Sequence, residues 1–586
     1  MSDRVQTLVS PLLRHGWRRA APVTAAIVSL VAVAAFLPSL PTTSPAGSRG
    51  GATALRGPGG SGLSGGAGAG GPSAQSSASA SASASAAAAA AAAESASAAA
   101  AAASGGAGGG GGGAAPTDNP ACHTYLGVTC TQIKIAYHWA QNYNECSGDQ
   151  NIVPFLKALG VNPDPQKSMG LLVPWFNAHA KDIWPQYAGR LGPHGFYGRD
   201  LVATAYPNDG GPFCDAVNRQ AAQQMYEDGN FAAVGGCVTC SSEGSSDVIQ
   251  QVLAQYHVIS VENTWNTDSY YANAQTAPYA WSSLVGGDTA VAHMTDLVCH
   301  EMVGRLSSAT GDSTTANKPR VFSVVNIDEP QENALGDEMV RNIKACGGTM
   351  AVDPAGHEEY QKDISTAAQQ AANIEFQQKS AGVTTVVCIC DAIAALEGVS
   401  EASGTNWGPE YVVSDFGYLD GTATVDAFPN AWRNAFAAAE TNAYDQSTQS
   451  WCDTAAGRAW CSSQGNATPP TDFILWYESL KVLGTMLVMA GPDLTPQNGY
   501  DAIVAHCSPC AAFGDTRHDD PMAGVGPSYA NGQFAPWKDY ELVHWDSNHD
   551  SPFATQYKGG NPHGTWRPLD PSIGWGRQSS WGIRTQ

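Results

Sequence analysis

The sequence predicts an α/β fold with two lobes, in which parallel sheets are flanked by helices and the chain makes hinge crossings between the lobes. Strand patterns alternate with helix patterns beyond residue 117 in two separate series. Strands separated by helices of ten or more residues form parallel sheets, so two series predict two lobes. The stretch from Gly57 to Ala115 is almost entirely Gly, Ala and Ser, which cannot bury an apolar core. About 470 of the 586 residues remain for the folded part.

The composition argues against a nucleic-acid partner. Lys and Arg number 29, Asp and Glu number 52, and the formal net charge is −23 at pH 7. A protein that binds nucleic acid through its phosphates needs the opposite balance. Charged residues make up only 14% of the chain and hydrophobic residues 43%, so a folded core is expected rather than an acidic disordered chain.

Residues 1–45 predict a signal peptide or a membrane anchor. Four arginines precede a mostly apolar run over residues 20–37, a pattern that both kinds of segment share. A spanning helix needs roughly 20 residues, so this run of about 18 leaves cleavage and anchoring both open. Residues 46–116 follow as a low-complexity Gly/Ala/Ser linker. We expect the remainder to be exported and extracytoplasmic, either anchored to the cell surface through this membrane segment or secreted.

Residues 117–285 predict the first part of lobe one. Short apolar runs that end in turn residues indicate its strands, and apolar residues at helical spacing indicate its helices. The strands are expected at 133–137, 199–205, 231–234 and 257–261, and the helices at 215–228 and 245–256.

Residues 286–425 predict lobe two, and the rest of the chain returns to both lobes. In lobe two, strands are expected at 320–326, 384–390 and 410–414, and helices at 333–345 and 363–380. Residues 426–520 are expected in lobe one, where 473–490 carries leucines on one helical face. Residues 521–586 are expected to form the last hinge crossing, with strands between 524 and 545, and a C-terminal tail on lobe two.

The 14 cysteines of this exported chain predict disulfide bonds rather than a metal or redox site. Two CxxC pairs, 237–240 and 507–510, lie about 270 residues apart, too far for a zinc ribbon. By spacing, Cys452 with Cys461 and Cys507 with Cys510 are expected as local bridges.

The chain lacks the motifs of the common enzyme classes, so we expect neither catalysis nor a cofactor. It has no HExxH, no Walker A loop and no GxGxxG after a strand. Its GxSxG pattern falls in the low-complexity linker, where no strand or helix can present the serine. Histidines and acids do not cluster at metal-ligand spacing.

The order of these elements resembles the type I periplasmic solute-binding proteins, specifically the leucine/isoleucine/valine-binding group of ABC importers. The resemblance extends from about residue 131 to 545, with insertions at about 141–190, 266–280 and 440–470. It is carried by an ordered series of short segments, namely 132–136, 198–201, 208–214, 234–242, 257–264, 347–349, 360–364 and 411–415.

The resemblance implies a ligand site between the lobes, and the positions of strand ends favour the same place. Ligands of parallel sheets bind outside the carboxyl ends of strands, against helix N-termini. In lobe one this predicts Ser241, Ser242, Asn263 and Thr264 as ligand-binding residues, with Trp139 packing on the ligand. One of the serines is expected to cap the following helix instead.

In lobe two, Asp391 and Asp415 end strands, and either is expected to pair with a cationic group or to be a solvated loop acid. The segment 328–332 lacks the aromatic residue that the family carries after the first strand of this lobe. The family also implies a bridge between Cys214 and Cys237, with Cys240 as the competing partner.

These features together predict an extracytoplasmic protein that captures a small polar ligand, an amino acid or a related compound, and delivers it to an ABC permease. The alternative is a surface-anchored ligand sensor or interaction protein on the same fold, which the long linker favours.

Overall fold

The computed structural model describes residues 122–139, 164–207, 215–235, 245–273, 275–308, 310–361, 364–421, 425, 428, 430–439, 460–464, 470, 472–506, 540–548 and 564–568. All of them lie in one compact unit of the chain. The predicted signal segment, the linker and Ser241, Ser242, Cys214, Cys237, Cys240, Cys452, Cys507 and Cys510 lie outside the described residues. None of the helices among the described residues is long and apolar enough to cross a membrane.

The first sheet has five parallel strands in the order β2-β1-β3-β4-β5. The strands are β1 (Gln132–His138), β2 (Asp200–Tyr206), β3 (Ala232–Gly235), β4 (Ile259–Glu262) and β5 (Ala280–Ser282). The first four occupy the predicted positions to within a few residues. The sheet with its helices forms lobe one, as the sequence predicts.

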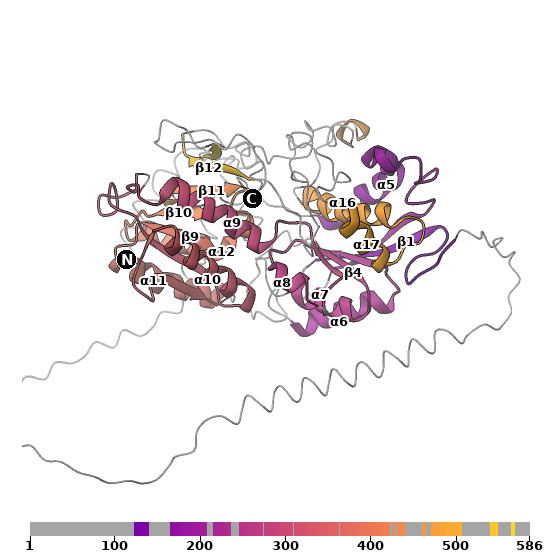
Figure 1. Cartoon of the computed structure of the whole chain (residues 1–586), viewed down its shortest axis with the longest axis horizontal. Helices are drawn as coiled ribbons and strands as arrows, with labels where there is room; N and C mark the ends of the chain where they lie inside the picture. Colours follow the sequence, from indigo (N-terminus) through magenta and orange to yellow (C-terminus); the bar gives the residue numbers. More distant parts are fainter. Residues whose placement is uncertain are drawn as a thin grey trace, which may run out of the picture. The chain divides into compact units, whose positions relative to one another are not determined.

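Helices cover both faces of this sheet (Figure 1). Along β1, Ile133, Ile135 and Tyr137 face one core cluster and Ala136 faces the other, as the two-residue period of a strand requires. The first cluster includes residues of α5 (Pro165–Ile183), α16 (Phe473–Ala490) and α17 (Pro496–His506). The second includes α6 (Asp215–Glu227) and α7 (Ser245–Gln255).

Helix α5 lies inside the segment that the sequence assigned to an insertion. Its start is defined by Asp164, whose carboxylate accepts a hydrogen bond from the Lys167 amide, and by Pro165 in the first turn. An internal proline, Pro174, obscures the helical pattern in the sequence. The helix buries Trp175 and Phe176 against α16 and is therefore part of the core of lobe one.

The second sheet has eight strands, and its order is β13-β12-β11-β10-β9-β6-β7 with β8 paired to β6. The pairings of β11 with β12 and of β12 with β13 are antiparallel, and the others are parallel. The strands are β6 (Val321–Ile327), β7 (Thr349–Met350), β8 (His357–Tyr360), β9 (Thr385–Ile389), β10 (Glu410–Val413), β11 (Ala435–Ala439), β12 (Glu541–Asp546) and β13 (Thr565–Pro568).

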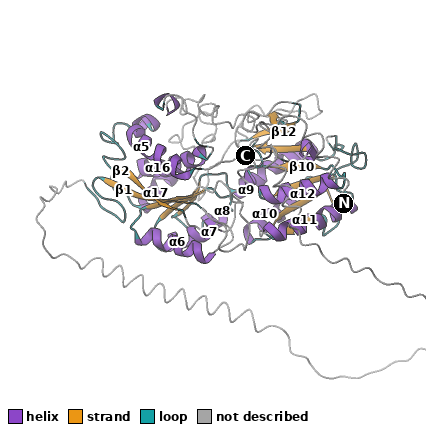
Figure 2. Cartoon of the chain, turned by 180° about the vertical axis from the view of Figure 1, so that it is seen from behind, coloured by secondary structure: helices purple, strands orange, loops and turns teal. Residues whose placement is uncertain are grey.

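Four helices flank the second sheet, which with them forms lobe two (Figure 2). They are α9 (Gly287–Asp296), α10 (Pro330–Ala345), α11 (Ile364–Ser380) and α12 (Ala392–Gly404). Successive residues of the strands again divide between two cores: Val387 faces the cluster with α9 and α10, while Val386 and Cys388 face the cluster with α12. Burial on both faces explains why these strands are nearly continuous apolar runs.

The chain crosses between the lobes three times among these elements, which confirms the predicted hinge crossings. It leaves lobe one after β5, returns with α16, and leaves again for β12. Strand β11 pairs with β10, so lobe two extends past the boundary that we expected at residue 425. Five small or aromatic apolar residues, AFAAA, form this strand, a run that does not distinguish a strand from a helix in the sequence.

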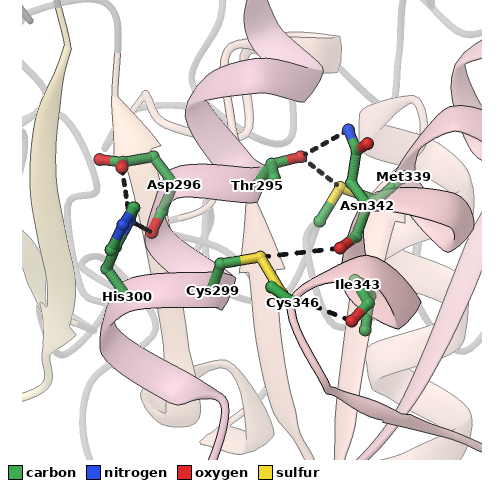
Figure 3. The surroundings of a disulfide bond; sticks show 8 residues. All are labelled: Thr295, Asp296, Cys299, His300, Met339, Asn342, Ile343 and Cys346. Carbon is green, nitrogen blue, oxygen red and sulfur yellow. Dashed lines mark hydrogen bonds and ion pairs between the residues drawn. A yellow bond between two sulfur atoms is a disulfide. The ribbon is translucent and has the colours of Figure 1, made fainter.

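Three disulfide bonds are complete among the described residues: Cys122–Cys130, Cys299–Cys346 and Cys388–Cys390. The sequence predicted none of them. Cys299 and Cys346 are 47 residues apart and meet because α10 packs beside α9, where the Asn342 amide also donates a hydrogen bond to the Thr295 hydroxyl (Figure 3). Cys461 is disulfide-bonded as well, to a cysteine outside the described residues.

Candidate functional site

The carboxyl ends of the lobe-one strands carry a buried histidine–carboxylate pair. The His138 Nε2 atom, at the end of β1, lies 2.9 Å from Glu262 Oε1, at the end of β4, and both side chains are almost fully buried. Gly235, at the end of the intervening strand β3, makes room for them: a Cβ there would lie 1.5 Å from Glu262 Oε2. The sequence analysis missed both His138 and Glu262, because each belongs to a strand pattern.

Asn263 directly follows β4, and its side chain joins a group of serines. Its amide nitrogen donates to Ser283 Oγ at 2.5 Å and lies 3.5 Å from Ser479 Oγ on α16. Ser479 in turn donates to the Gly235 carbonyl oxygen at 3.4 Å. The Asn263 Oδ1 atom is buried and accepts no hydrogen bond from any described residue. Asn263 therefore presents a buried acceptor at the predicted end of the sheet.

The predicted residue Thr264 also lies at this end, but its side chain contacts the protein. Its hydroxyl is 2.5 Å from the Tyr271 hydroxyl, and its carbonyl oxygen accepts from Ser282 Oγ at 2.6 Å. Tyr271 belongs to the short helix α8 (Asp268–Tyr271). Thr264 thus fixes α8 and β5 against the end of β4.

Trp139, the residue after β1, is half-buried and packs on aromatic residues of lobe one. Its ring stacks on Tyr137 with centroids 5.5 Å apart, and Tyr137 meets the edge of Trp476 on α16. Packing of Trp139 on a ligand stays a prediction.

Asp391, at the end of β9, is a helix cap. Its Oδ1 accepts from the Ala394 amide at 3.0 Å in the first turn of α12, and its Oδ2 accepts from the Tyr360 hydroxyl at 2.9 Å. An acid is therefore favourable where β9 ends and α12 begins, because it satisfies a free amide of the first helical turn and lies at the positive end of the helix dipole. A direct role in ligand binding stays a prediction.

Asp415, just past the end of β10, links the two lobes. It is fully buried, and its Oδ2 accepts a hydrogen bond from the Trp265 indole nitrogen at 3.1 Å. Trp265 follows Thr264 in the lobe-one connection, and its ring packs against Phe416 and Tyr418. The structure therefore brings Asp415 to the residues that follow β4, and its pairing with a ligand stays a prediction.

Further acidic groups gather around Tyr418. Burial, followed by the nearby carboxylates of Asp415, Glu478 and Asp420, raises the pKa of Tyr418 well above its ordinary value. Glu478 belongs to α16 of lobe one and Asp420 to the loop after β10 of lobe two, and both are buried. Tyr418, Glu478 and Asp420 were not among the predicted site residues, whereas Asp415 was. The available signal was Glu478 itself, a charged residue within a helix that is apolar on nearly all sides.

Among the residues that the structure describes, no group of three His, Cys, Asp or Glu side chains is placed to hold a metal ion. The site combines buried carboxylates and the Asn263 Oδ1 acceptor with serine and tyrosine hydroxyls and aromatic rings. Such a set is suited to bind a ligand that donates hydrogen bonds or carries positive charge.

Comparisons with known proteins give matches among solved structures. No family model and no curated protein matches the chain. A solute-binding protein of an ABC transporter from Rhodopseudomonas palustris, in complex with 4-hydroxybenzoate, is 12% identical; the match covers 75% of this chain and 96% of that one, with a TM-score of 0.48. An ABC-transporter substrate-binding protein from Desulfitobacterium hafniense, in complex with Leu, is 13% identical, with 71% and 98% covered and a TM-score of 0.45.

A leucine-binding protein, LivK, from Thermotoga maritima is 10% identical, with 70% of this chain and 95% of that chain covered and a TM-score of 0.46. The chain is similar to each of these solved structures at low sequence identity.

Proposed function

We propose that this protein binds a small polar ligand between its two lobes and delivers it to an ABC permease outside the cytoplasm. The observation that carries this proposal is the hydrogen bond from Trp265 to Asp415. It joins the carboxyl end of a lobe-one strand to the carboxyl end of a lobe-two strand, the place where parallel sheets bind ligands.

The ligand that fits this site carries an ammonium group, as an amino acid does. Asp415 and Asp420 approach from lobe two, and Glu478 and the side-chain oxygen Oδ1 of Asn263 lie on the lobe-one side. Each is a hydrogen-bond acceptor, and charge-assisted bonds from an ammonium to carboxylates are about twice as strong as neutral ones. Ser241 and Ser242 remain the proposed partners of the ligand carboxylate.

A thermal-shift screen of the purified protein against amino acids, amides, sugars and peptides identifies the ligand class. A ligand at 100 times its dissociation constant stabilises the folded state by about 2.7 kcal/mol, which is readily measured. Amines and amino acids are expected to raise the unfolding temperature. A panel in which only sugars or carboxylates without an amine do so would contradict the proposed ligand class.

Calorimetry on variants then tests the placement of the site. Asp415→Ala removes one side of a buried charge pair, which typically costs about 2–5 kcal/mol of binding, so affinity is expected to fall roughly 30-fold or more. Thr264→Ala removes a neutral hydrogen bond to Tyr271 within lobe one, so it is expected to lower the stability of the fold by about 1 kcal/mol and to weaken binding less than Asp415→Ala does.

The matched control is Asp182→Ala, which removes an exposed acid at the end of α5 and is expected to leave affinity unchanged. Wild-type affinity in Asp415→Ala, with a folded protein, would show that the ligand binds elsewhere.

A further inference from the structure

Lobe two contains a cavity on the face of its sheet that α11 and α12 cover. Its volume is about 50 Å³, and it is lined mainly by apolar residues. Small residues on both helices leave part of this space open, namely Ala371 on α11 and Ala394, Ala395 and Gly398 on α12, beside larger lining residues such as Ile374 and Val399. Interiors are normally close-packed, so a space of this size within a lobe is a candidate binding site.

Two buried hydrogen-bond donors line this cavity. Tyr411, on β10, is 6% exposed, and Trp432, in the turn before β11, is 1% exposed. Their rings stack with centroids 5.6 Å apart. Within the described residues, neither the Tyr411 hydroxyl nor the Trp432 indole nitrogen has a hydrogen-bond partner. A buried polar group without a partner is strongly disfavoured, and an indole N–H can only donate, so the missing partner must be an acceptor.

The size and the wall decide what that acceptor belongs to. A cavity of roughly 150 Å³ takes benzene, and a single water needs about 10–15 Å³ of such volume, so this one suits three or four heavy atoms. Because most of its lining is apolar, several waters would have too few polar partners, whereas one oxygen attached to an apolar group matches both parts of the wall. The buried Glu375 carboxylate, which also lines the cavity and already accepts from the Thr405 hydroxyl at 2.6 Å, disfavours an anion. An ammonium ion would leave the Trp432 donor without an acceptor.

We propose that this cavity is a second binding site, separate from the one between the lobes, for a small neutral molecule with an acceptor oxygen, such as a short-chain alcohol or ketone. The oxygen accepts from Tyr411 and Trp432, and the apolar part contacts the alanines of α11 and α12. Four heavy atoms bind no more tightly than about 40 µM, so a dissociation constant in the millimolar range is expected.

Titration of 2-propanol into the full chain, followed by saturation-transfer NMR on the alcohol, tests this site. Saturable binding is expected, and Tyr411→Phe and Trp432→Phe are each expected to raise the dissociation constant roughly fivefold by removing one donor. Ala395→Val adds two methyl groups to the cavity and is expected to abolish binding. Tyr226→Phe, which alters a tyrosine stacked on Tyr256 in lobe one, is the control with unchanged binding.

Isopropylammonium has the same shape as 2-propanol but only donates hydrogen bonds, and no binding is expected. Equal binding of the two, binding that survives Ala395→Val, or no saturable binding of the alcohol would each overturn the proposal. Thermal unfolding of every variant verifies that loss of binding is not loss of the fold. A crystal soaked in 2-propanol that holds only water in the cavity would also overturn it.

Discussion

Replacing Glu410 by Ala is expected to destabilise lobe two severely, because the substitution leaves the Arg320 guanidinium buried without its carboxylate. The two side chains are 0% and 2% exposed. Arg320 Nε lies 2.6 Å from Glu410 Oε2, and Arg320 Nη2 lies 2.9 Å from Glu410 Oε1. Glu410 also accepts from Thr385 Oγ1 at 2.9 Å. The pair joins the beginnings of β6 and β10, at the end of the sheet away from the candidate site.

The expected loss is about 3–5 kcal/mol, the range measured when one partner of a buried ion pair is removed. Counting the lost bonds gives a similar figure, since two charge-assisted hydrogen bonds are worth about 1.5–3 kcal/mol each. A loss of this size is a large part of the stability of an ordinary domain, about 5–15 kcal/mol.

Urea unfolding followed by circular dichroism measures the effect. The double variant Arg320→Met/Glu410→Leu is the matched control, because well-packed apolar residues often replace a buried pair without loss. We expect the double variant to unfold at a higher urea concentration than Glu410→Ala. A single variant as stable as the wild type, or a double variant as unstable as the single one, would refute the reasoning.

Three further predictions concern stability. Gly484→Ala is expected to destabilise the protein by about 1–3 kcal/mol, because the new Cβ on α16 would lie 2.3 Å from the Trp184 ring. This clash outweighs the better helix propensity of Ala. A raised unfolding temperature would contradict this. Burial raises the pKa of Glu358 from 4.5 to about 7. Between these two pH values the folded state holds a proton that the unfolded state releases. The free energy of unfolding should therefore fall by about 3 kcal/mol as pH rises from 4.5 to 7. Glu358→Gln should remove that decline in unfolding measured across this range. Burial raises the pKa of Asp312, but hydrogen bonds that include one from the Gly408 amide outweigh it and lower the pKa to about 2. Because solvent screens this partly exposed carboxylate, it should stabilise the folded state by about 1 kcal/mol above pH 3.8. That stability should be lost as pH falls towards 2 and be absent in Asp312→Asn.

The fold could be predicted from the sequence wherever a strand is buried on both faces. Such strands are short apolar runs, and β1, β6 and β10 begin within a residue of their predicted positions. Prediction failed where the pattern is ambiguous or interrupted. Helix α5 contains Pro174, and β11 consists mostly of alanine, so neither has a distinctive periodicity.

The candidate site could be predicted in part, through the residues that directly follow strands. Asn263, Thr264 and Asp415 lie where the strand ends place them, and Asp415 meets Trp265 across 150 positions of sequence. Glu262 and Glu478 were missed because they lie inside secondary-structure elements. Glu262 reaches the site through the order of strands in the lobe-one sheet and Glu478 through the packing of α16, and no local pattern encodes either.

The central claim is that the ligand binds between the carboxyl ends of the two sheets. A crystal structure of the protein with a ligand from the thermal-shift screen tests this most directly. We expect one ligand in contact with both Asn263 after β4 and Asp415 after β10, with its amine on the carboxylate. A ligand that contacts the strand ends of one sheet alone, or lies away from both, would contradict it.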